Sequence, residues 1–591
     1  MFLLFFSIAL IIYANTIRNG FVLDDQDLIV NNAYIKNFEF LPRLFSNNAY
    51  HFSSSPGSNY YRPLQLVSYA IDHHFWRLDP AYYHFGNIFF HAINSFLVCI
   101  LVLRLFASFR LALLSGLLFC VHPVHASVVG YIAGRADLFV TFFMLLSLLD
   151  FLNYLKTKKL YKYVMSLLFF GLALLSRENS LLLPFILILL AFVQGEKIKK
   201  ILLPLAGFLA LAVFYIYGRF LFLGGLAMLV PEVKLFSLPL ELVNLAGIMK
   251  EYLSVILFPW SFYPMRTIPF IETLTLWNVL WAVYLFGLAG SLFLWAFLKR
   301  KRLFVFGILW FICGFLPLIR MMYLFPRFGI VVAENWMYLP SIGIFIILSR
   351  LFLIKKNGWL LWIFILFFCY CSVLTILNNG HWKDRVTLYR YILKAYPDNT
   401  NIRLNLAYIY FDNGSYDLAL REFNKILESE PTAWDVYLGL GNIYYAKGEL
   451  ERAVLFYDQA ILFNHNCGLA YYNKGLISVR QSKYDEARDF FFKALEINQD
   501  YWPTYLALGD WFSRKGMDRE ALIMYEKAER LNPDSNILLK TSVVLIRQKE
   551  YQKAVVVLEG VLKRDPNSIE AVKMLGLCYG QMGRSDDPPN L

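Results

Sequence analysis

Two adjacent carboxylates, Asp24 and Asp25, follow the first apolar segment of the chain. Paired carboxylates can supply a general base, or they can hold a divalent cation. An acidic pair by itself is more often the solvated start of a loop. Here the pair opens a long loop, residues 16–84, that also contains Tyr60-Tyr61-Arg62-Pro63. We therefore take Asp24 and Asp25 as the candidate catalytic residues, and as the ligands of a metal if one is bound.

A second polar cluster, His122-Pro123-Val124-His125, separates two apolar segments and is followed by Arg135 and Asp137. Histidines three residues apart share a face only if the segment is helical, and Pro123 indicates that a helix begins or ends there. A zinc site has weak support, because no third ligand has a suitable spacing. The Arg135 guanidinium can bind a phosphate through two hydrogen bonds. Alternatively, Arg135 pairs with Asp137.

Two more clusters place carboxylates between apolar segments. Glu178 lies in Ser176-Arg177-Glu178-Asn179, and Glu334 and Tyr338 lie in the stretch 333–340. The simpler interpretations are a charged hairpin tip and an interfacial aromatic belt. Ionisable groups at membrane depth are costly, however, and favour a functional interpretation. Four loops with carboxylates and arginines predict an active site for an amphiphilic, phosphorylated substrate.

The composition explains what must position these groups. Of the 591 residues, 58% are hydrophobic and only 17% are charged, and the mean hydropathy is +0.50. Soluble globular proteins carry about 25% charge, so an ordinary soluble enzyme and a disordered chain are both excluded. The net charge of +13 suits either a nucleic-acid partner or membrane topology.

Apolar runs near the length of a membrane span fill residues 1–378. We expect about eleven spans, at 1–15, 85–105, 111–121, 138–155, 161–175, 181–193, 201–223, 276–297, 303–319, 336–353 and 359–377. With the N-terminus inside, every short inside connection is basic, as the positive-inside rule requires. The positive charge therefore reports orientation, and a nucleic-acid partner is dropped. The segment 240–260 carries three charges and predicts an interfacial helix.

A 34-residue repeat follows the last span. Ala407, Gly441, Gly475 and Gly509 recur at this period, which is typical of tetratricopeptide (TPR) repeats. Five units run from about 400 to 566, and a sixth begins near 569. We expect a linker and half repeat at 379–399 and a TPR domain at 400–591, on the outer side of the membrane, because the span count is odd. The predicted fold is all-α, a membrane helix bundle followed by a solenoid that binds a protein or peptide.

The motifs and their order resemble the TMTC family of transmembrane and tetratricopeptide-repeat proteins, which are similar to protein O-mannosyltransferases of the GT-C fold class. The resemblance covers nearly the whole chain. It matches Asp24 and Asp25 to the acidic motif that supplies the catalytic carboxylate. The remaining matches, all implied donor-phosphate or substrate-binding residues, are Arg62 in YRP, His122 and His125 in HPVH, Arg135 in GRADL, Glu178 in the hairpin, and Glu334 and Tyr338 in the AE motif.

The resemblance implies a polyprenyl-phosphate sugar donor, such as a mannose donor, and a protein or other hydroxyl acceptor on the outer side. One of Asp24 or Asp25 accepts the acceptor's proton, Arg135 and Arg62 stabilise the leaving phosphate, and the anomeric centre is inverted. The residues establish no cofactor, and they leave open a divalent cation held by Asp24 and Asp25. Two positions depart from the family pattern. Ser127 and Asn335 stand where Glu and Arg are common.

Those departures leave a second hypothesis open, a non-catalytic membrane-anchored TPR scaffold for periplasmic or lumenal proteins. A flippase is disfavoured, because its ionisable residues belong near the midplane of the bilayer. The polar clusters favour the enzyme, because an anchor gains nothing from charges at several outer loops. Membrane lipids are expected partners in either case. The short connections and few repeats favour a bacterial inner membrane with periplasmic repeats over an endoplasmic reticulum membrane.

Overall fold

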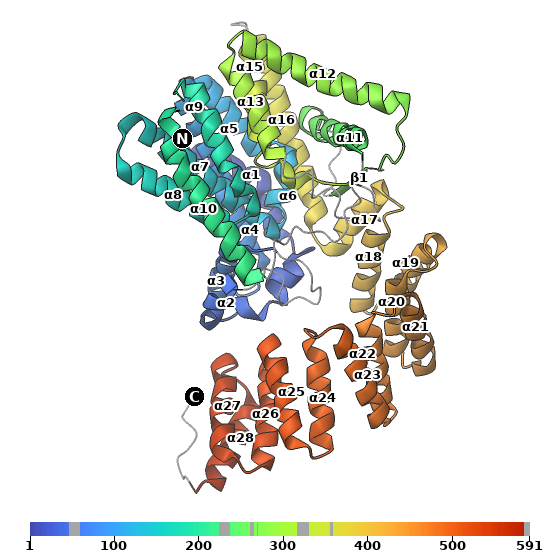
Figure 1. Ribbon diagram of the computed structural model, residues 1–591. Helices are drawn as coiled ribbons and strands as arrows, with labels where there is room; N and C mark the ends of the chain where they lie inside the picture. The colour runs from blue at the N-terminus through green and yellow to red at the C-terminus, as the bar shows by residue number, and fades with distance from the viewer. Residues whose placement is uncertain are drawn as a thin grey trace. The chain divides into compact units, whose positions relative to one another are not determined.

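The computed structural model describes residues 1–46, 60–197, 199–223, 237–259, 265–268, 270–315, 330–354 and 358–583. Helices dominate both halves of the chain, which confirms the all-α prediction (Figure 1). Contacts divide the chain into a membrane unit that ends at Asn399 and a repeat array that begins at Thr400. Each unit is described by itself below.

The helices of the membrane unit follow the predicted apolar runs. They are α1 (Phe2–Tyr13), α4 (Pro80–Phe106), α5 (Phe109–Val121), α6 (Ala126–Val129), α7 (Arg135–Thr157), α8 (Leu160–Leu174), α9 (Leu183–Gln194), α10 (Lys199–Leu223), α11 (Leu238–Leu257), α12 (Leu276–Leu298), α13 (Arg302–Phe315), α15 (Ser341–Phe352) and α16 (Trp359–Asn379).

Five helical stretches among the described residues are long and apolar enough to cross a membrane, and α5 with the turn after it makes a sixth that is bent by 50°. Five shorter apolar helices occupy the remaining runs. The structure therefore places an apolar helix in each of the eleven predicted runs, while the span count itself stays a prediction. The helix α11 is not among them and buries Val243 and Ala246 with Ala282 of α12.

Local sequence explains where several of these helices begin. Asp79 caps α4 by accepting from the backbone N–H of Ala81, and Pro80 occupies the first turn. Ser108 caps α5 through the N–H of Leu111. Side-chain oxygens at this position satisfy N–H groups that have no partner within the helix, and proline is tolerated in the first turn because its missing N–H costs nothing there.

Close helix crossings use glycine. The helices α13 and α15 meet where Gly307 and Gly343 face each other, and an added Cβ on Gly307 would stand 2.6 Å from the Gly343 carbonyl oxygen. On α5, an added Cβ on Gly116 would stand 2.8 Å from the Phe5 ring of α1. Small residues let helix backbones approach and gain dispersion contacts. Together with α4 and α7, these helices enclose the apolar core of the unit.

Short elements lie between the helices of the membrane unit. The predicted outer loop contains η1 (Ala14–Arg18), η2 (Gln26–Val30), η3 (Ala33–Ile35), η4 (Phe38–Phe40), α2 (Leu41–Ser46) and α3 (Pro63–Trp76), and its residues 47–59 lie outside the described residues. The others are η5 (Pro123–His125), η6 (Ile132–Gly134), η7 (Glu178–Leu182), η9 (Glu334–Met337), η10 (Gly380–Trp382) and α17 (Arg385–Ala395). Strands β1 (Met265–Ile268) and β2 (Ile330–Ala333) pair antiparallel, with Met265 opposite Ala333.

In its described residues, 400–583, the array has five helical hairpins and one further helix. Its helices are α18 (Thr400–Asp412), α19 (Tyr416–Ser429), α20 (Trp434–Ala446), α21 (Leu450–Phe463), α22 (Gly468–Arg480), α23 (Tyr484–Ile497), α24 (Trp502–Arg514), α25 (Asp518–Leu531), α26 (Ser535–Arg547), α27 (Tyr551–Arg564) and α28 (Ile569–Gln581). Each hairpin lies at one of the predicted units, and α28 lies where the sixth is expected to begin.

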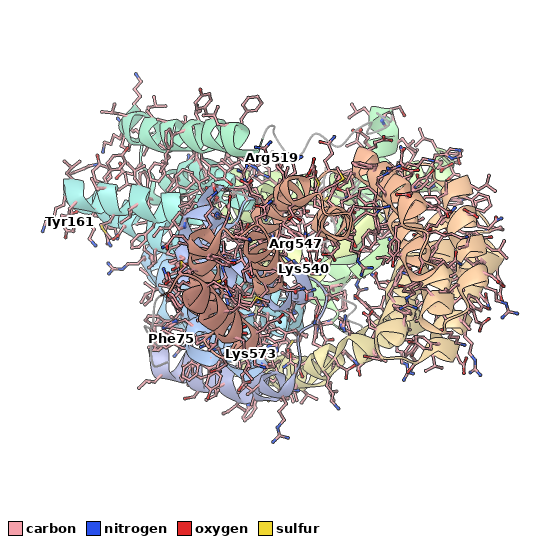
Figure 2. The ribbon with its side chains drawn as sticks, turned by 90° about the horizontal axis from the view of Figure 1, so that it is seen from below. Phe75, Tyr161, Arg519, Lys540, Arg547 and Lys573 are labelled. Atoms are coloured by element: carbon pink, nitrogen blue, oxygen red, sulfur yellow. The ribbon has the colours of Figure 1, made fainter. Side chains whose placement is uncertain are left out.

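The residues that recur at the repeat period pack the two helices of each hairpin. Gly441, Gly475 and Gly509 face the rings of aromatic residues 16 positions later, and an added Cβ would overlap those rings. Polar contacts also join consecutive units. In α26, where Figure 2 labels Lys540 and Arg547, Lys540 Nζ lies 2.9 Å from Asp510 of α24, and Arg547 pairs with Asp518.

Candidate functional site

We call the stretch Leu23–Asp27 the acidic loop. Its adjacent carboxylates, Asp24 and Asp25, lie in different environments. The Asp25 side chain is fully buried. Its Oδ2 accepts from the backbone N–H of Val22 at 2.9 Å, and its Oδ1 accepts from that of Ala133 at 2.8 Å. Burial raises the pKa of the Asp25 carboxyl well above its ordinary value, although these two donors act in the opposite direction. Asp25 therefore ties the acidic loop to the segment that precedes α7.

Asp24 is the exposed member of the pair. Its backbone N–H donates to the Tyr131 hydroxyl at 3.1 Å. The preceding residue, Leu23, has a φ of +48°, a left-handed conformation that is uncommon for a leucine. This turn directs the two adjacent side chains into different surroundings. Of the two residues, Asp24 is thus the one exposed to solvent.

Arg135 begins α7 and is buried. Its guanidinium donates to Asn87 Oδ1 at 3.0 Å, to the Tyr83 carbonyl at 2.7 Å and to Ser68 Oγ at 3.3 Å, and it pairs with Asp72 of α3. The sequence alternative in which Arg135 pairs with Asp137 is not what the structure shows. Its donors join α3 and α4 to the start of α7, which is a structural role.

The motif histidines are buried and bonded to carbonyl groups. Nε2 of His122 lies 3.0 Å from the Ile256 carbonyl, while its Nδ1 accepts from the Val124 N–H at 3.3 Å. This arrangement fits a neutral imidazole that carries its proton on Nε2. His125 bonds the Phe119 carbonyl and Ser341 Oγ. Both histidines thus stabilise the break between α5 and α6.

Tyr338 belongs to the same buried framework. His91 Nε2 lies 2.9 Å from the Cys120 carbonyl, so its Nδ1 accepts the Tyr338 hydroxyl proton at 2.8 Å. The Asn94 amide donates to the Tyr338 oxygen at 3.3 Å. A connected chain of buried hydrogen bonds fixes the side chains that form it. Tyr338 therefore holds η9 against α4.

The charged motif residues gather elsewhere, beside the first turn of α7. Glu178 lies between two arginines, 3.2 Å from Arg219 Nη1 of α10 and 3.9 Å from Arg62 Nε. Arg177 pairs with Asp137 in the first turn of α7. All five side chains are at least nine-tenths buried. Buried charges persist only where they are paired, so these residues form one linked set.

Two residues extend this set through η9. Asn335 Nδ2 donates to Asp137 Oδ2 at 3.3 Å. Glu334, which is 2% exposed, lies 3.5 Å from Arg266 Nη2 of β1. Arg266 also lies 3.7 Å from Glu251 of α11, whose side chain is 30% exposed. We call the residues Arg62, Asp137, Arg177, Glu178, Arg219, Arg266, Glu334 and Asn335 the arginine cluster. It holds four arginines and three carboxylates.

Sequence reasoning missed two members of the arginine cluster, Arg219 and Arg266. An arginine inside an apolar helix was the available signal for Arg219, whereas Arg266 stands in a stretch with no strong periodicity. Of the two departures from the family pattern, Ser127 is buried and Asn335 is partly buried. The Ser127 hydroxyl has no hydrogen-bond partner among the described residues. No group of three or more His, Cys, Asp or Glu side chains suited to a metal occurs in the described part of the chain.

Comparison with known proteins adds to this geometry. Residues 83–217 match the model of the dolichyl-phosphate-mannose-protein mannosyltransferase family, and residues 377–466, 468–501 and 537–568 match tetratricopeptide-repeat models. Protein O-mannosyl-transferase F38B6.6 of Caenorhabditis elegans is 28% identical over 70% of this chain and 60% of its own length. Human protein O-mannosyl-transferase TMTC4 is 26% identical over 71% of this chain and 64% of its own.

The chain is TMTC-like. One polypeptide matches both the mannosyltransferase model, in its membrane segment, and the tetratricopeptide-repeat models after it. The chain covers less than two thirds of the length of these relatives. Among solved structures, the TPR protein YrrB aligns with 31% of this TMTC-like chain at 20% identity and a TM-score of 0.26.

Proposed function

We propose that the chain is an integral-membrane glycosyltransferase that moves a mannose-like sugar from a polyprenyl-phosphate donor to a hydroxyl group of a protein. The match to the mannosyltransferase model and the names of the relatives support this class of reaction. The apolar helices suit a donor whose tail stays in the bilayer. The reaction takes place on the outer side, where the predicted topology puts the acidic loop.

The arginine cluster is the observation that carries the proposal. Four arginines with three carboxylates lie beside the first turn of α7, and the acidic loop is bonded to the segment just before that turn. The N-terminus of a helix favours anions, and guanidinium groups bind phosphate oxygens in pairs. We assign the donor phosphate to Arg62, Arg177 and Arg219. Arg135, predicted as a phosphate ligand, is better suited to its structural contacts.

The reaction then needs one base. The acceptor hydroxyl oxygen forms a bond to the anomeric carbon while the bond from that carbon to the phosphate oxygen breaks. The proton of the hydroxyl goes to Asp24, and polyprenyl phosphate leaves with the electron pair. A single displacement inverts the anomeric centre. Asp24 serves as the base because it is exposed, whereas both oxygens of Asp25 accept backbone N–H groups. No step passes through a metal.

The test uses the purified full chain in lipid nanodiscs with radiolabelled polyprenyl-phosphate mannose and a hydroxyl-bearing peptide. Transfer of label to the peptide, with release of polyprenyl phosphate, is the expected result. Asp24→Asn should remove the transfer, while Arg110→Gln, an exposed change, should not. If Asp24→Asn, folded as the wild type, transferred sugar at the wild-type rate, the assignment of the base would be wrong.

The scaffold hypothesis is the second candidate. Asn335 favours it, because Asn335 gives Asp137 a neutral partner where the family pattern has an arginine. A scaffold would release no polyprenyl phosphate with any donor and would still bind protein through the array. The sequence favours a bacterial inner membrane, whereas the named relatives are animal proteins. The proposal therefore places the reaction on the outer side of the membrane without naming the membrane.

A further inference from the structure

The connection between the last membrane helix and the array is residues 379–399, and it packs within the membrane unit. It begins where α16 ends and contains η10 and α17. The Asn379 amide donates to the Ile12 carbonyl at 3.0 Å, and the Gly20 N–H donates to the Lys383 carbonyl at 2.8 Å. The connection is thus bonded to the chain that leads into the acidic loop.

A contact between two aromatic rings also joins the connection to Tyr131, the residue that bonds the Asp24 backbone. Trp382 of the connection is 2% exposed and stacks on Tyr131, with ring centroids 5.4 Å apart and planes 22° apart. It lies against Gly130, where an added Cβ would stand 3.5 Å from the indole. The Tyr131 carbonyl accepts from the Asn87 amide at 3.0 Å, which fixes the other end of the residue.

Tyr131 in turn holds the backbone of the proposed base, because its hydroxyl accepts the Asp24 N–H at 3.1 Å. A second residue of the connection, Tyr389 of α17, is buried. Burial raises the pKa of the Tyr389 hydroxyl to about 12, and the Asp24 carboxylate acts in the same direction. The connection therefore reaches Asp24 through the ring of Tyr131.

We propose that Trp382 is a positioning residue for Asp24, acting through Tyr131, so that the segment leading into the array is also part of the support of the acidic loop. If the connection only anchored α17, apolar packing would be enough and no directed contacts would be needed. Here the contacts of the connection are directed to Tyr131, which holds the Asp24 backbone, and to Gly20. The effect on catalysis rests on the proposed function. The effect of these contacts on the position of the Asp24 backbone is independent of that function.

The experiment measures hydrogen–deuterium exchange at single amides in the full chain in nanodiscs. Tyr131→Phe keeps the stacked ring and removes the acceptor, and Trp382→Ala removes the stack. In both, exchange of the Asp24 amide should rise by about tenfold, the effect of one lost hydrogen bond. Trp382→Phe should restore much of the protection. Trp362→Ala, a change at a 68% exposed residue of α16, is the control and should leave exchange unaltered.

Unchanged exchange at Asp24 in Tyr131→Phe and Trp382→Ala would overturn the proposal, and so would a rise spread evenly over the membrane unit. Transfer assays form the second readout. For an active wild type, both variants should lower kcat with the KM for the donor unchanged. A wild type without transfer activity would refute the proposed function alone, because the exchange measurement does not depend on it.

Discussion

The backbone N–H of Ala133 donates a 2.8 Å hydrogen bond to Oδ1 of Asp25, across 108 residues of sequence. This bond fixes the acidic loop to the segment that starts α7, next to the arginine cluster. It also uses the carboxylate oxygen that a catalytic base would need. The adjacent aspartates therefore have separate tasks, one structural and one open to chemistry.

The first prediction concerns catalysis by Asp24. Asp24→Asn should lower kcat by about 10²- to 10⁴-fold, because a general base contributes that much. Its melting temperature in detergent should equal that of the wild type, because the side chain is exposed. Kinetics with the sugar donor, together with thermal melts, check both points. A large fall in melting temperature would assign Asp24 to folding instead.

The second prediction concerns Asp25 and pH. Burial raises the pKa of Asp25, so the folded chain keeps a proton there that the unfolded chain has released. The contribution of this group to stability is complete below the ordinary aspartate pKa of about 3.9 and is lost as the pH rises through the raised value. Thermal melts from pH 5 to 8 should therefore show the wild type losing stability relative to Asp25→Asn. A constant difference between the two would contradict the raised pKa.

Much of the fold could be predicted because it depends on period and composition. Apolar runs and the 34-residue repeat are local patterns, and the structure has helices at each of them. The rows of small and aromatic residues in the array, such as Gly475 and Phe491, meet as the pattern predicts.

The candidate site could be predicted only in part, because partners far apart in sequence cannot be read from spacing. Arg135 pairs with Asp72 and not with its neighbour Asp137, since α3 packs across the start of α7. His122 looks like a ligand in sequence, but its ring bonds a carbonyl of α11. Arg219 and Glu178 are far apart in sequence, and only the packing of α10 brings their side chains together.

The third prediction concerns helix packing in the array. Gly475→Ala should destabilise the array by about 1–3 kcal/mol, because the new methyl group would overlap the Phe491 ring and overpacking costs that much. Gly576→Ala is the matched control, since nothing lies within 4 Å of its added Cβ. There the change should stabilise the helix by up to about 1 kcal/mol. Hydrogen exchange of α22 and α23 in the full chain reports the difference, and equal exchange in the two variants would refute the packing argument.

The fourth prediction separates Arg135 from the arginine cluster. Arg135→Gln leaves Asp72 without its buried partner, a change that typically costs about 3–5 kcal/mol. It should lower the melting temperature far more than it lowers donor affinity measured on the remaining folded protein. Stable Arg135→Gln protein with normal melting and weakened donor binding would restore Arg135 to the phosphate site.

The fifth prediction concerns Arg219, which no motif indicated. Arg219→Gln should weaken binding of the polyprenyl-phosphate donor by about 10- to 100-fold, because a hydrogen bond to a charged group contributes about 1.5–3 kcal/mol. The variant loses the interaction of one guanidinium with the phosphate. Glu178 keeps a charged partner, because Arg62 still pairs with it. Binding of a fluorescent polyprenyl phosphate without sugar measures the effect apart from catalysis.

Arg110→Gln is the control for that measurement, because Arg110 is exposed and far from the cluster in the predicted topology. Equal affinity in Arg219→Gln and Arg110→Gln would exclude Arg219 from the phosphate site. Weaker binding of the lipid phosphate with unchanged binding of an uncharged polyprenol would show that the phosphate, and not the tail, meets Arg219. The arginine cluster would then be the donor site, with Asp24 as its base on the loop bonded to the same end of α7.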